Sequence, residues 1–237
     1  MNWYKKANLY DEISNHGPKG SGYFPRHETF NYGEGEYENL VQYAQNKFNS
    51  SREEAEEYVR GNIRGIRRDY FVSNYGWSVP TEDITTKLAQ FIGNDTVLEV
   101  GSGYGLWSKL LNDMGVNTIA TTRRSDNEQD ATHMPQKDRS FTDVENIKNL
   151  DAVEKYPQAN VLMMSWPPYN DAMAYQTLKN FKGNKIIYIG EGSGGCTGCD
   201  RFHNLLNKEW KEVYDFDVED LPQWAGLHDA VYLYVRG

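Results

Sequence analysis

The residues whose types and spacing could do chemistry are concentrated in residues 96–111 of this 237-residue chain, TVLEVGSGYGLWSKLL. The first five are mostly apolar or β-branched, which predicts a strand buried on both faces. Gly101, Gly103 and Gly105 then allow a sharp turn and the close approach of a ligand to the backbone. The following helix would point its amide-rich N-terminus at that ligand, and Glu99 lies where a carboxylate can meet a positive or hydroxyl-bearing group. We therefore expect a cofactor site at this turn.

The glycine spacing narrows the choice of ligand. A P-loop is excluded because no Gly-Lys-Ser/Thr follows the glycines. The dinucleotide fingerprint G-x-G-x-x-G is not met either, because Leu106 stands at the position of its third glycine. The three-glycine pattern alone is weak evidence for a cofactor site. Its place after the first strand of a β/α succession makes that evidence stronger.

A second candidate stretch, SWPPY at 165–169, follows another buried strand. Trp166 and Tyr169 are placed to wall a pocket beside a planar substrate, and Ser165 could contact it. The two prolines also fit a rigid turn with no chemical role.

Ligands bind at the carboxyl ends of the parallel strands in an open α/β sheet. That rule brings the glycine turn, residues 165–169 and two further loops, 191–199 and 221–228, to one edge. Glu191 and His228 in these loops could act as a general base or bind a polar substrate. A structural role is the commoner use of such residues.

Cys196 and Cys199 form a C-x-x-C sequence. Zinc would need two further ligands, which no paired Cys or His spacing supplies. A redox motif would lie on a thioredoxin-type βαβ unit. We expect two ordinary thiols at a helix start, with lowered pKa values.

The elements that position these residues alternate between strand and helix. We expect strands at 96–100, 116–121, within 141–147, and at 159–166, 185–190, 212–218 and 230–235, and helices from residue 81, from residue 106, and at 150–156, 171–181 and 200–210. The alternation predicts an α/β fold whose seven-stranded sheet is mostly parallel, with helices on both faces. No helix separates the last two strands, so we expect an antiparallel terminal pair.

The chain divides into an N-terminal helical extension or cap, residues 1–74, and a domain that holds the sheet, residues 75–237. Within the extension we expect helices in 1–15 and at 36–48. The glycine- and aromatic-rich segment 16–35 is a plain loop or part of a lid.

A longer helix is predicted at 51–71, capped by Ser51. Four arginines fall on one stripe of this helix: Arg60, Arg64, Arg67 and Arg68. Such a stripe could hold a phosphate or a polynucleotide. We favour a solvated face that pairs with glutamates of the same helix.

Charge and composition exclude several functions. The net charge of −9 disfavours broad binding to nucleic acid or an anionic membrane, although not a local basic patch. No apolar run is long enough to cross a membrane, and the first ten residues lack the apolar core of a signal peptide. We expect a cytoplasmic protein.

The sequence E-x-G-x-G-x-G at 99–105 resembles motif I of the class I S-adenosylmethionine-dependent methyltransferases. Seven strands with an antiparallel terminal pair also resemble the Rossmann-like fold of that superfamily. The resemblance implies S-adenosyl-L-methionine as cofactor, with Glu99, Gly101 and Gly103 at its methionine part and Gly105 in the same turn. Aromatic faces at Trp77 and Trp166, with Tyr169, could receive the sulfonium.

The chain departs from this superfamily at the second strand. Its members usually carry an acid there that holds the ribose hydroxyls, whereas the corresponding place falls at Thr121 or Thr122, and Asp126 comes a few residues late. Glu145, after the third strand, is a candidate for the adenine end.

The block 165–169 is similar to the (Asp/Asn/Ser)-Pro-Pro-(Tyr/Phe/Trp) motif of amino-directed methyltransferases. In that motif the polar residue orients an amine and the aromatic stacks on the substrate. Here Trp166 occupies the polar position and Ser165 comes one residue early, so the match is partial.

Residues 75–237 resemble, as a whole, a group of uncharacterised methyltransferase-like proteins. The matching blocks are YGWSVPTEDI, VLEVGSGYGLW, LMMSWPPYNDAMAY, IIYIGEGSGGCTG and LPQWAGLHD. We therefore expect methyl transfer to a small-molecule or protein acceptor. The alternatives are a phosphate- or nucleotide-handling enzyme, a non-catalytic module that binds S-adenosylmethionine or a nucleotide, and an amino-methyltransferase of nucleic acid.

Overall fold

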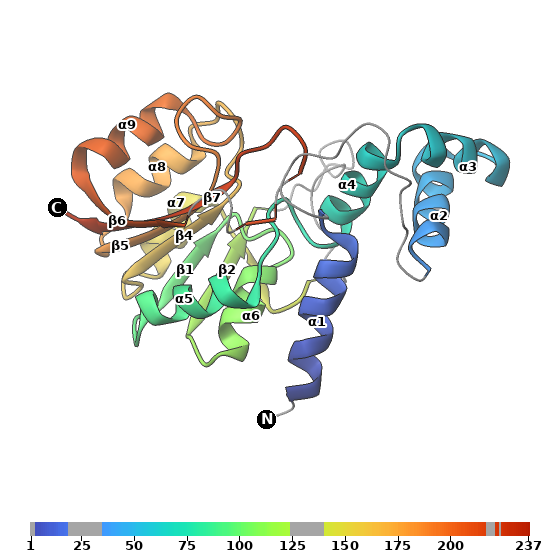
Figure 1. Cartoon of the computed structure of the whole chain (residues 1–237). Helices are drawn as coiled ribbons and strands as arrows, with labels where there is room; N and C mark the ends of the chain where they lie inside the picture. The colour runs from blue at the N-terminus through green and yellow to red at the C-terminus, as the bar shows by residue number, and fades with distance from the viewer. Residues whose placement is uncertain (1–2, 19–34, 124–139, 217–220, 223) are drawn as a thin grey trace.

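A seven-stranded sheet forms the centre of the protein in this computed structural model, which describes residues 3–18, 35–123, 140–216, 221–222 and 224–237 (Figure 1). The strands are β1 (Val97–Val100), β2 (Thr118–Thr122), β3 (Val144–Asn146), β4 (Val161–Ser165), β5 (Lys185–Gly190), β6 (Trp210–Phe216) and β7 (Ala230–Arg236). The helices are α1 (Trp3–His16), α2 (Glu36–Phe48), α3 (Arg52–Gly61), α4 (Ile63–Asn74), α5 (Glu82–Ile92), α6 (Leu106–Asp113), α7 (Asn149–Lys155), α8 (Met173–Asn180) and α9 (Asp200–Glu209).

The strands lie in the order β3-β2-β1-β4-β5-β7-β6. β7 runs antiparallel to both β5 and β6, and the other neighbouring strands are parallel. The predicted α/β sheet with an antiparallel terminal pair is therefore confirmed, and element ends differ from the predictions by a few residues. Because Gly190 pairs with Ala230, the start of β7 lies at the sheet edge where β5 ends.

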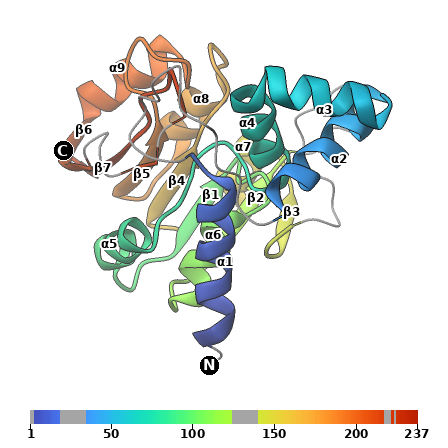
Figure 2. The ribbon, with the colours of Figure 1, turned by 45° about the vertical axis from the view of Figure 1, so that its right-hand side comes forward.

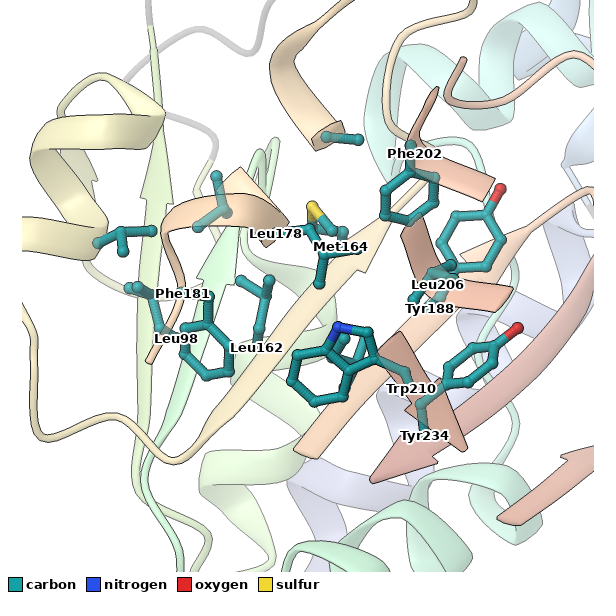
Figure 3. Close-up of a cluster of buried hydrophobic side chains, with 14 of the residues drawn as sticks. Leu98, Leu162, Met164, Leu178, Phe181, Tyr188, Phe202, Leu206, Trp210 and Tyr234 are labelled. Atoms are coloured by element: carbon teal, nitrogen blue, oxygen red, sulfur yellow. The ribbon is translucent and has the colours of Figure 1, made fainter. Parts of the chain in front are cut away.

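Helices cover both faces of the sheet, as the alternation predicts (Figure 1). α5 and α6 contribute Ile84, Leu88 and Trp107 to one core. α8 and α9 contribute Leu178 and Phe202 to the other, with side chains of β1, β4 and β5 between them (Figure 3). Each fully buried side chain of this kind stabilises the fold by roughly 1.5–3 kcal/mol.

The helix predicted at 51–71 is two helices, which corrects the prediction from sequence. Ser51 caps α3 as predicted, in a capping box with Glu54. At Asn62 the backbone leaves the helical region, with φ −138° and ψ 39°, and α4 starts in a new direction. Gly61 and Asn62 are both weak helix formers, so a helix end at this point costs little.

The break also divides the arginine stripe. Arg60 is exposed and lies 3.6 Å from Glu56. Arg67 is buried and its Nε lies 2.6 Å from the carboxylate of buried Glu36 at the start of α2. Arg68 is half-buried on another side of α4. The four arginines thus do not form one continuous basic face for a polynucleotide.

The extension packs on the sheet domain through α1 and α4. Ile13 of α1 and Phe71 of α4 share a buried cluster with Leu106 and Leu110 of α6 and with Trp224. Figures 1 and 2 show α1 beside α6. Segment 19–34, which includes most of the predicted loop or lid, lies outside the described residues.

Candidate cofactor and acceptor site

The glycine turn joins β1 to α6 at the carboxyl edge of the sheet. Gly101, Gly103 and Gly105 all have positive φ, at 78°, 57° and 74°. The backbone N–H groups of Gly101 and Ser102 donate to the carbonyl of Thr121 at 2.8 and 2.9 Å, which ties the turn to β2. The turn therefore needs glycine for its conformation.

Two of these glycines meet different surroundings. A Cβ at Gly105 would lie 2.8 Å from Val144 Cγ2 and 2.9 Å from Thr142 Cγ2, so the chain entering β3 packs on this residue. A Cβ at Gly103 would meet no described atom within 4 Å. The open face of the turn is thus at Gly103, where a ligand can approach the backbone.

Glu99 lies beneath the turn and is 1% exposed. Its carboxylate accepts a hydrogen bond from Ser108 of α6. Burial raises the pKa of this carboxyl to about 7, and the hydrogen bond from Ser108 lowers it only in part. The hydroxyl of Thr121 donates to the Glu99 carbonyl at 2.8 Å. The described contacts of both side chains are therefore within the scaffold of the turn.

An aromatic pair lies where β4 ends, on the strand next to β1. The rings of Trp77 and Trp166 stack with centroids 5.0 Å apart and 14° between their planes. Ser78 ties this pair to the sheet, because its hydroxyl lies 2.7 Å from the Ser165 hydroxyl and accepts from the Trp107 indole at 2.8 Å. Trp166 has a φ of 50°, which is strained for a bulky residue and is typical of functional sites.

Arg68 of α4 covers this pair, a contact that was not predicted from the sequence. Its guanidinium carbon lies 5.4 Å from the Trp77 ring centre and 6.0 Å from that of Trp166. Both distances are within the range of cation–π attraction. No local pattern identifies this contact, because Trp166 lies far along the chain from Arg68 and Trp77.

A hollow of about 530 Å³ lies beside the ends of β5 and β4. Its lining comprises Tyr169, Glu191, Gly192, Ser193, Gly194, Gly195, Cys196 and His228. The predicted meeting of loops 165–169, 191–199 and 221–228 at one edge is therefore correct. Tyr169 is 69% exposed, so its ring is available to a substrate.

Glu191 holds two of these loops together. Its carboxylate accepts from the backbone N–H groups of Cys196 at 2.6 Å and His228 at 2.9 Å. Burial acts to raise the pKa of this carboxyl, but hydrogen bonds from Cys196 and His228 outweigh it and lower the pKa. Glu191 Oε1 also lies 3.6 Å from Nδ1 of the exposed His228 ring.

Two titratable side chains at this edge need comment: Cys196 differs from the prediction, and Asp229 was not predicted to be part of the site. Burial and the Glu191 carboxylate raise the pKa of Cys196 to about 11, so the expectation of a lowered thiol pKa is wrong for this residue. Burial also raises the pKa of Asp229 to about 6, although the Trp166 indole and the charge of Arg68 act to lower it. Asp229 was not predicted from the sequence, because its burial just before β7 depends on tertiary packing.

The described partners of Glu145 do not include any of these groups. Its carboxylate pairs with Lys155 at 2.5 Å and accepts from the Tyr156 hydroxyl. An adenine contact at Glu145 stays a prediction. Asp126 lies outside the described residues.

The described part of the chain contains neither a metal-binding cluster nor a membrane-spanning helix. Its His, Cys, Asp and Glu side chains form no group of three that could hold a metal ion. None of its helices is long and apolar enough to cross a membrane.

The turn fits the methionine end of S-adenosylmethionine in one further respect. The Ser102 hydroxyl oxygen is enclosed and has no hydrogen-bond partner among the described residues. A buried polar atom without a partner is costly and indicates a missing ligand or water. It lies between Gly101 and the open position at Gly103, where an amino-acid group of the cofactor would approach.

No protein-family model and no curated protein sequence matches this chain. Solved structures resemble it in fold. Sp1610 from Streptococcus pneumoniae, in complex with S-adenosyl-L-methionine, has 13% identity and a TM-score of 0.45, over 67% of this chain and 74% of that one. TehB from Haemophilus influenzae has 13% identity and a TM-score of 0.44, over 72% and 67%. The glycopeptide N-methyltransferase MtfA, complexed with S-adenosyl-L-homocysteine, has 11% identity and a TM-score of 0.42, over 65% and 89%.

Likeness at this level concerns the fold alone. The strand order β3-β2-β1-β4-β5-β7-β6 with a reversed β7 defines the same architecture independently. The protein thus has the Rossmann-like fold of the class I S-adenosylmethionine-dependent methyltransferases.

Proposed function

We propose that this protein transfers a methyl group from S-adenosylmethionine to a small-molecule or protein acceptor. The observation that carries the proposal is the turn at the end of β1, which is open at Gly103 and leaves the Ser102 hydroxyl without a partner in the described chain. The cofactor supplies, when bound, a methyl group activated on a sulfonium sulfur.

The residues of the chain would act mainly by position. Methyl transfer is an in-line displacement, so the site must align the acceptor with the methyl group and exclude water. The turn holds the methionine end, and the stacked Trp77 and Trp166, with Arg68 against them, wall the site beside it. The acceptor occupies the hollow beside Tyr169. His228 takes the acceptor's proton at Nε2, while Glu191 lies on its Nδ1 side.

The proposal is tested by calorimetry with S-adenosylhomocysteine and a matched pair of glycine variants. Gly103→Ala adds a methyl group at the open face and should weaken binding at least tenfold. Gly115→Ala imposes a similar backbone strain, at φ 88° and with no described atom near its Cβ, at the opposite edge of the sheet. It should bind as wild type does, while each variant loses about 1–2 kcal/mol of unfolding free energy.

Two results would reject the proposal. One is no binding of cofactor or product to the wild-type chain at millimolar concentration. The other is equal affinity in Gly103→Ala and Gly115→Ala, which would show that the turn is not the cradle.

A second candidate is a non-catalytic module that binds the same cofactor. It is favoured by the end of β2, where Thr121 stands near the place of the usual ribose acid and donates its hydroxyl to the Glu99 carbonyl. Labelled S-adenosylmethionine that binds but transfers no label to a broad set of extract components would support this candidate.

A further inference from the structure

Arg68 makes no close ion pair with the described residues, although its charge acts on the buried Asp229 carboxyl. It is half-buried, yet no carboxylate of the described residues lies within 4 Å of its guanidinium. Its neighbours on the predicted stripe differ, since Arg60 lies near Glu56 and Arg67 contacts Glu36. A partly desolvated arginine is usually paired with a carboxylate or phosphate.

The position of Arg68 points to the site. Its guanidinium carbon lies 5.4 Å from the Trp77 ring centre and 6.0 Å from that of Trp166, and a ring contact uses none of its five N–H donors. Its charge also acts on Cys196, in the lining of the hollow, and on Asp229 at the start of β7.

We propose that Arg68 binds a ligand carboxylate against the Trp77–Trp166 pair, so that the N-terminal extension supplies the anion-binding residue of the site. The inference rests on the proposed function and assigns a task to α4. The carboxylate has two possible sources, the amino-acid end of the cofactor and the acceptor. A planar guanidinium suits either, because it can donate two parallel hydrogen bonds to one carboxylate.

Two pairs of probes separate these sources. S-adenosylmethionine and its decarboxylated form differ in the cofactor carboxylate. Benzoate and benzamide, titrated into the protein with saturating S-adenosylhomocysteine, differ in the charge of a planar acceptor-like group. Binding is followed by calorimetry and by indole fluorescence in the full chain, for wild type, Arg68→Lys, Arg68→Met and Arg60→Met.

If the cofactor supplies the carboxylate, Arg68→Met should weaken the binding of S-adenosylmethionine at least tenfold and leave the binding of its decarboxylated form unchanged. If the acceptor supplies it, Arg68→Met should abolish the preference for benzoate over benzamide. Arg68→Lys should retain part of either preference. Arg60→Met removes the same charge from an exposed position and should behave as wild type.

The inference is overturned if Arg68→Met and wild type show the same preference within both pairs. Equal weakening of both members of a pair also overturns it, because that result identifies Arg68 as a support for the tryptophans. Failure of the proposed function is distinct, since the wild-type chain would then bind neither form of S-adenosylmethionine. Benzoate and benzamide, repeated without S-adenosylhomocysteine, would still test Arg68.

Discussion

Single residues of the site combine burial with chemistry in ways that their types alone do not show. Glu99 precedes the glycine turn as motif I requires, yet its carboxylate is enclosed and bonded to Ser108. Arg68 belongs to a stripe that charge counting assigns to solvent, yet it lies on two tryptophans. At this scale the identity of a residue could be predicted, but its partner depends on how separate elements pack together.

The buried Glu99 predicts a specific dependence of stability on pH. Its pKa is about 7 in the folded chain, against an ordinary value of 4.5 for an exposed glutamate, so the folded state binds the proton more tightly. The stabilisation is fully present below pH 4.5 and is lost as pH rises through 7. A shift of this size corresponds to about 3 kcal/mol.

Glu99→Gln removes this titration. We therefore expect the unfolding free energy of the variant, relative to wild type, to rise by about 3 kcal/mol between pH 4 and pH 8. Urea unfolding at intervals of one pH unit measures it. Asp229 titrates in both proteins, so its contribution cancels in the difference between their unfolding free energies. Parallel stability profiles for the two proteins would show that Glu99 has no raised pKa.

At the scale of elements, hydrophobic periodicity predicted which helices and strands exist, but it missed the change of chain direction between α3 and α4. Residues 36–48 and 185–190 match α2 and β5 in both bounds. The apolar spacing continues through Asn62, so the sequence predicted α3 and α4 as one helix. The break follows from tertiary packing, because α4 must place Phe71 on α6 while α3 packs on α2.

The start of α4 is fixed by a buried ion pair. Arg67 lies against Glu36 of α2 and donates to the Asn15 carbonyl near the end of α1 at 3.1 Å. Arg67→Met leaves the Glu36 carboxylate buried without its cation, and should lower the unfolding free energy by about 3–5 kcal/mol. The double variant Glu36→Met/Arg67→Met should recover most of that loss.

Helical circular dichroism in urea measures both effects. Arg60→Met is the control, because its exposed pairing with Glu56 should be worth less than about 1 kcal/mol. An equal small effect of Arg67→Met and Arg60→Met would contradict a stabilising role of the buried pair.

At the scale of the whole molecule, the hydrophobic cores of the sheet are larger than the core of the N-terminal helices. The sheet is enclosed between helices on both faces, whereas Leu40, Val59 and Ile66 belong to a separate cluster whose described members all come from α2, α3 and α4. The general fold and the edge that carries the site could be predicted, because both follow from β/α alternation. The packing of the extension could not, because residues 1–74 carry no resemblance and the sequence predicts no strand among them whose pairing would constrain them.

Hydrogen exchange should reveal this division. Local opening has a lower free energy where fewer buried apolar contacts must separate. We expect backbone amides of α2 and α3 to exchange well before those of β1, β4 and β5. Equal protection in all five elements would show that the extension opens only with the sheet.

The reversed direction of β7 has a consequence for how such a protein can diversify. Because β7 begins at the edge where β1, β4 and β5 end, the segment that leads into it delivers His228 to the hollow. A parallel β7 would begin at the far edge. Under the proposed function, cofactor recognition and acceptor recognition lie on different segments, so a lineage could exchange the segment before β7 and change its substrate while the glycine turn stays as it is.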